Sequence, residues 1–122
     1  MRPATPWPLA ATAAAFLLAA LALAGCAGGP TTFTVVLKDN QFNVEKDGQF
    51  VPGNLDGVHK GDTIVFRNDD DHLHAVVIHD TTFEEYVQPG SSVSYVVRDA
   101  PDTYHTQCSI HTSMQMYITV VA

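Results

Sequence analysis

The chain has few positively charged residues and is too short for more than one domain. It has six Lys or Arg against thirteen Asp or Glu among 122 residues, a formal net charge of −7. A surface this acidic repels nucleic acid phosphates and favours basic partners. The length leaves room for one domain, and nothing after residue 31 shows a sustained helical period.

The chain also lacks an apolar run long enough to cross a membrane. Arg2 is followed by an uncharged run from Leu9 to Ala24. That run is shorter than the roughly 18–20 residues of a membrane-spanning helix, and it ends at small residues, as a secretory signal does. We therefore expect residues 1–25 to be a cleaved signal peptide. The alternative is a permanent membrane helix.

The end of this run, Leu23-Ala24-Gly25-Cys26, resembles the lipobox of bacterial lipoproteins. The resemblance implies that Cys26 is lipidated and becomes the first mature residue, anchored on the periplasmic or cell-surface side of a bacterial membrane. Residues 26–31 contain two glycines and predict a flexible tether. Cys108 would then be the only thiol, so no intramolecular disulfide could form. The alternative is a secreted protein in which Cys26 is incidental.

After residue 31 the pattern of hydrophobic residues is that of β-strands. Five runs alternate in polarity or are rich in branched and aromatic side chains: residues 33–37, 63–66, 75–78, 93–97 and 117–121. Between strands lie turn-forming residues, among them Asp39-Asn40, Asp47-Gly48, Pro52-Gly53-Asn54, Lys60-Gly61-Asp62, Pro89-Gly90 and Pro101-Asp102. Short strands at this spacing predict an all-β sandwich or barrel.

Three metal-ligating side chains lie close together near the C-terminus. Cys108, His111 and Met114 fall within seven residues, directly before the last expected strand. A site of two histidines and one cysteine with a distant methionine is typical of electron-transfer copper. Zinc would accept the cysteine and histidines but gains nothing from a thioether. The spacing therefore indicates copper.

His74 is the expected second histidine of that site. If a strand begins at His74, then His74, Val76 and Ile78 share one buried face. A buried imidazole needs a partner, and a metal ion would supply one.

Residues 32–122 resemble a small cupredoxin of the plastocyanin and amicyanin type. The matching pieces are Lys60-Gly61-Asp62-Thr63 before Val65-Phe66, Asn68 and Asp70 ahead of His74, Pro89-Gly90 before Ser94-Tyr95, and Tyr104 ahead of Cys108-Ser109-Ile110-His111. The resemblance implies a Greek-key β-sandwich with one type 1 copper ion, held equatorially by His74, Cys108 and His111. Residues 46–57 are longer than in the shortest relatives and have no assigned place.

Met114 and Met116 both fit axial-ligand patterns of that family. The relatives place inward apolar residues four and six positions after the axial methionine. Counted from Met114 these positions are Ile118 and Val120, whereas counted from Met116 the second is the chain end, Ala122. We therefore expect Met114 to be the axial ligand.

Other candidate ligands have simpler explanations. We interpret Asp69-Asp70-Asp71 as a solvated turn, because it lacks the spacing of a calcium loop. His72 could form a His-x-His clip with His74, but a place in the turn or in solvent is the expected one. His59, His79 and His105 are expected at the surface, where any could weakly bind extra metal.

The resemblance implies an electron carrier and not a catalyst. It would be a monomer that passes single electrons between extracytoplasmic redox proteins, such as a basic c-type cytochrome. The enzyme alternative is a copper oxidase or nitrite reductase. Those proteins resemble several such domains joined together, and one domain of this length cannot supply their additional coppers alone. Copper storage or delivery remains the alternative, because ligand types alone do not separate these uses.

Overall fold

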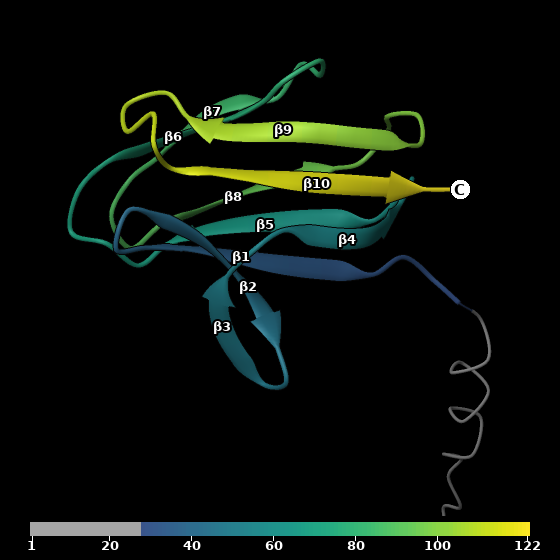
Figure 1. The fold of residues 1–122 in the computed structure, drawn as a ribbon, viewed down its shortest axis with the longest axis horizontal. Coiled ribbons are helices and arrows are strands. Elements are labelled where there is room, and N and C mark those ends of the chain that lie inside the picture. Colours follow the sequence, from purple (N-terminus) through teal and green to yellow (C-terminus); the bar gives the residue numbers. More distant parts are fainter. Residues whose placement is uncertain (1–27) are drawn as a thin grey trace, which may run out of the picture.

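The computed structural model describes residues 28–122, which form a sandwich of two five-stranded β-sheets (Figure 1). One sheet has the order β3-β2-β1-β5-β8 and the other β4-β10-β9-β6-β7. The strands are β1 Thr32–Lys38, β2 Gln41–Lys46, β3 Gln49–Pro52, β4 Leu55–His59, β5 Thr63–Asn68, β6 His74–Ile78, β7 Glu84–Val87, β8 Ser92–Val96, β9 Asp102–Cys108 and β10 Gln115–Val121. The predicted all-β sandwich is confirmed. Among residues 28–122 no helix is long and apolar enough to span a membrane.

The expected signal peptide, residues 1–25, and the lipidated Cys26 lie outside the described residues. Of the expected tether, residues 28–31 are described, and they are exposed and form no strand.

The core lies between the sheets and follows the strand period. On β10 the buried residues Met116, Ile118 and Val120 alternate with exposed or half-exposed neighbours. Alternate burial is what a sheet with one packed face requires. On the facing sheet Phe66 of β5 is fully buried and stacks on Phe83 at a centroid distance of 5.7 Å.

Two of the predicted turns are tight hairpin turns. Asp39 and Asn40 join β1 to β2 with φ of 55° and 56°, and Asp47 and Gly48 join β2 to β3 with φ of 53° and 81°. Asn, Asp and Gly tolerate this left-handed conformation, which suits two-residue hairpins. Residues 46–57, for which the sequence predicted no place, form the last residue of β2, all of β3 and the start of β4.

Two loops meet at one end of the sandwich and carry the candidate ligands (Figure 1). One joins β5 to β6 and ends at His74, and the other joins β9 to β10 and begins after Cys108. The strands that hold them are antiparallel neighbours, with Val76 of β6 opposite Cys108 of β9. The register brings the start of β6 and the end of β9 together.

Candidate metal centre

His74 lies at the first position of β6 and is fully buried. Its Nε2 lies 2.7 Å from Oδ2 of Asp70. A carboxylate only accepts, so Nε2 carries the proton and Nδ1 keeps its lone pair. Nδ1 lies 3.7 Å from Sγ of Cys108. The hydrogen bond to Asp70 therefore presents the unprotonated nitrogen to the thiol, as a partner of a metal-bound histidine does.

The β9–β10 loop supplies Cys108, His111 and Met114. Its backbone closes on itself, because the Cys108 N–H donates to the Met114 carbonyl at 3.0 Å and the Met114 N–H donates to the His111 carbonyl at 2.9 Å. Cys108 is fully buried, and its Sγ lies 3.8 Å from Nδ1 of His111. The Ala75 N–H points at the same sulfur at 3.4 Å. This N–H would stabilise a thiolate.

The spacing of the three donors fits a single ion. Bonds of about 2.3 Å to sulfur and about 2.0 Å to nitrogen, as for a first-row ion such as zinc, place donors 120° apart at about 3.7 Å from each other. The observed sulfur-to-nitrogen distances are 3.7 Å for His74 and 3.8 Å for His111. Both sulfur-to-nitrogen distances therefore match a site in which His74, Cys108 and His111 share one ion.

The two methionines occupy different places. Met114 lies in the loop just before β10 and is 1% exposed, and its backbone bonds both Cys108 and His111. Met116 lies within β10 opposite Thr106 of β9, and both methionines belong to the hydrophobic core. The backbone hydrogen bonds thus tie Met114 to the loop that holds Cys108 and His111.

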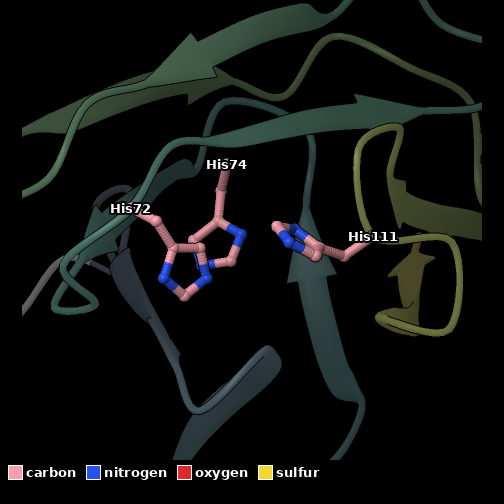
Figure 2. A group of neighbouring side chains, drawn as sticks. All are labelled: His72, His74 and His111. Carbon is pink, nitrogen blue, oxygen red and sulfur yellow. The ribbon is translucent and has the colours of Figure 1, made fainter.

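A third imidazole, that of His72, lies beside those of His74 and His111. Figure 2 shows the rings of His72, His74 and His111 gathered together, and their ligand atoms all lie within 4.8 Å of one another. Both nitrogens of His72 have other partners, Oδ1 of Asp71 at 2.9 Å and Oδ1 of Asn40 at 2.7 Å. His72 is therefore held in the turn beside the site, although a ring rotation would make it a further donor.

Asp70 corrects our interpretation of the acidic triplet as a solvated turn. It is only 9% exposed, and it accepts hydrogen bonds from His74 and from the backbone N–H groups of Asp39 and Asn40. Burial raises the pKa of Asp70, but these hydrogen bonds outweigh it and hold the pKa below its ordinary value. The sequence signal was its position four residues before His74, which we had taken as part of the family resemblance and not as a contact with His74.

Asn68 fixes the loop that carries Asp70 and His74. It is fully buried at the end of β5. Its amide nitrogen donates to the carbonyls of His72 and Val87, both at 2.8 Å, and its amide oxygen accepts from the Asp70 N–H at 2.9 Å. Every polar atom of the buried amide has a partner, so Asn68 stabilises this conformation of the loop.

Comparison with known proteins agrees with this fold. Residues 8–120 match the model of the cupredoxin-like domain family. The chain is a cupredoxin. Several solved structures resemble this cupredoxin, and a search of curated protein sequences gives no significant match.

Three of those structures illustrate the likeness. The Cu(I) form of a point mutant of amicyanin is 19% identical over 80% of this chain and 88% of its own, with a TM-score of 0.58. A purple cupredoxin from Nitrosopumilus maritimus is 21% identical over 75% of this chain and 99% of its own, with a TM-score of 0.56. The copper-containing nitrite reductase of Thermus scotoductus SA-01 is 24% identical over 76% of this chain, with a TM-score of 0.58, but this cupredoxin spans only 22% of its length.

Proposed function

We propose that this cupredoxin binds one copper ion through His74, Cys108 and His111, with Met114 as axial ligand, and carries single electrons between extracytoplasmic redox proteins. The observation that carries the proposal is the pair of distances from the Cys108 sulfur, 3.7 Å and 3.8 Å, to the two histidine nitrogens. The resemblance to amicyanin and to the purple cupredoxin supports it.

The chain's contribution to such a function is a site that changes little with oxidation state. Copper bound there would supply the one-electron couple, since thiolate, imidazole and thioether donors accept both its valences. His74 and Cys108 are fully buried. The hydrogen bond that His74 donates to Asp70 and the hydrogen bonds within the β9–β10 loop hold them. Donors that are already in place need little rearrangement on electron transfer, so the barrier is low.

Copper loading with its reversal tests the proposal. Adding Cu²⁺ should produce intense visible absorption from the Cys108 thiolate, which should vanish on reduction and return on reoxidation without added metal. Cys108→Ser should abolish this absorption, because the thiolate supplies the transition. The control is His59→Asn, which changes an exposed histidine of β4 and should keep the full absorption. Binding of zinc with no colour on copper addition would overturn the proposal.

A chelation experiment distinguishes copper delivery from electron transfer. The reduced protein is mixed with a strong Cu(I) chelator, and the buried donors should release copper slowly. Loss of copper within the mixing time, with transfer to an acceptor protein, would make delivery the better account.

We infer a basic partner, such as a c-type cytochrome, that docks where Ile110 meets solvent. Ile110 is 46% exposed and is the chain neighbour of His111. An apolar contact beside a ligand suits electron entry, and the net charge of −7 would steer a cation to it. The rate of electron transfer to such a cytochrome should fall steeply as salt is added, whereas a rate independent of salt would contradict steering.

A further inference from the structure

A second pair of histidines lies on the outer face of the β6–β9–β10 sheet. His79 directly follows β6, and His105 belongs to β9. The strand register places them opposite each other, since Ile78 faces Thr106 and the His79 N–H donates to the His105 carbonyl at 2.9 Å. Their rings are stacked, with centroids 5.0 Å apart and planes 7° from parallel. Neighbouring strands thus present two imidazoles side by side at the surface.

Hydrogen bonds fix the same tautomer in both rings. His105 Nε2 lies 2.8 Å from Oε1 of Gln115, and His79 Nε2 lies 3.4 Å from Oε1 of Gln107. An amide oxygen only accepts, so each Nε2 carries the proton and each Nδ1 keeps a lone pair. Within residues 28–122 neither Nδ1 has a hydrogen-bond partner. Both rings therefore keep one nitrogen with a free lone pair. Because the lone pairs of nearly parallel rings lie in nearly parallel planes, one ring must turn for both nitrogens to bind the same ion.

The two glutamines are themselves oriented by one backbone group. Gln107 and Gln115 face each other across β9 and β10, and the amide nitrogen of each donates to the Thr112 carbonyl, at 2.9 Å and 2.8 Å. With their nitrogens held there, their oxygens turn toward the histidines. Thr112 follows His111 in the loop of the candidate metal centre, so the network joins the histidine pair to that loop.

We propose that His79 and His105 form a second metal site, which takes a borderline divalent cation such as Cu²⁺ or Zn²⁺. Neutral imidazole is a ligand for these ions, whereas Ca²⁺ and Mg²⁺ require oxygen ligands. Two imidazoles on adjacent strands supply part of the coordination sphere, and water completes it at the exposed face. The net charge of −7 favours cation approach. This site shares no ligand with the one formed by His74, Cys108, His111 and Met114.

Electron paramagnetic resonance during copper titration tests the second site. The protein, purified as cells process it, receives up to three equivalents of Cu²⁺. The second equivalent should give a spectrum of nitrogen-ligated Cu²⁺ without intense visible absorption. His79→Asn and His105→Asn should each weaken its binding at least tenfold, because each removes one of the two ligands. His59→Asn, an exposed histidine on β4, is the matched control and should bind as the wild type does.

The experiment distinguishes failure of the second site from failure of the proposed function. Failure of the proposed function appears as missing visible absorption in the wild type. The second site is instead detected by the paramagnetic signal. If this signal persists in both His79→Asn and His105→Asn, the inference is wrong. A measurement without variants is Zn²⁺ titration of the apoprotein followed by NMR. The ring protons of His79 and His105 should shift together with the second equivalent, and unshifted signals would also overturn it.

Discussion

Met114 and Met116 are chemically identical but should respond differently to substitution. Met114 lies in the ligand loop, so Met114→Leu should raise the reduction potential and keep the intense absorption, because a thioether that favours Cu(II) is lost. Its stability should change by less than about 1.5 kcal/mol, since leucine conserves volume. Potentiometry and urea unfolding measure the two effects.

Met116 provides the comparison. It is 2% exposed within the core, so Met116→Ala should lower the free energy of unfolding by about 2–5 kcal/mol. The potential should stay near that of the wild type. A larger shift in potential from Met116→Leu than from Met114→Leu would show that Met116 is the axial ligand.

At the scale of single residues, the sequence indicated the candidate donors but not the residues that hold them. Cys108, His111 and Met114 are close in the chain, and His74 follows from strand parity, so ligand chemistry and strand parity together indicated them. The contacts of Asp70 were not predicted because its partners include the backbone of the β1–β2 turn, about 30 residues away. Contacts between loops of different strands are not encoded in local periodicity.

Asp62 ties the β4–β5 turn to the start of β1. Its carboxylate accepts from the Thr31 N–H at 2.8 Å and the His59 N–H at 2.7 Å. The hydrogen bond from Thr31 lowers the pKa of Asp62, burial opposes this, and the hydrogen bond from His59 adds to the lowering, so the net pKa lies below 3.8. A carboxyl group whose pKa is lower in the folded state than in the unfolded state stabilises the fold at pH values above its unfolded pKa. This contribution is lost as the pH falls through the folded pKa.

Asp62→Asn should therefore cost about 1–3 kcal/mol of unfolding free energy at pH 7, because a charged acceptor of two backbone donors is lost. The difference in unfolding free energy between Asp62→Asn and the wild type should shrink as the pH falls below about 4 and through the lowered pKa of Asp62. Urea unfolding at pH 7 and pH 3 measures both. Asp56→Asn, an exposed acid of β4, is the control and should leave stability nearly unchanged. A loss from Asp62→Asn that is the same at both pH values would contradict this role.

At the scale of elements, hydrophobic patterns predicted ranges for β1, β5, β6, β8 and β10 but for none of the other five strands. In β3 no residue is fully buried, and Phe50 is 42% exposed with the Arg67 guanidinium 5.7 Å from its ring centroid. A strand that packs no face on the core carries no alternation of hydrophobicity. The turn residues on either side of β3, Asp47-Gly48 and Pro52-Gly53-Asn54, were its local signals.

For the whole molecule, the expected lipid anchor remains a prediction, since Cys26 lies outside the described residues. We expect Cys26→Ala to move the protein from the membrane to the soluble fraction or to block its processing, because the lipid acceptor is lost. Cell fractionation measures this. Cys108→Ser, which changes the other cysteine, should leave the membrane location as it is. A Cys26→Ala protein that stays in the membrane would support a retained helix.

The direction of β1 determines which end of the domain would lie farthest from the membrane if Cys26 carries a lipid. Thr32 pairs with Thr63 at the start of β5, and β5 ends at Asn68 beside the metal centre, so the chain joins the domain at the far end of the sandwich (Figure 1). Seven strand residues span about 20 Å, and a six-residue tether adds about 13 Å. His111 would then stand about 30 Å above the headgroups. Such a carrier would search for partners in the layer of proteins that rise from the membrane or diffuse past it, and not among redox centres within the bilayer.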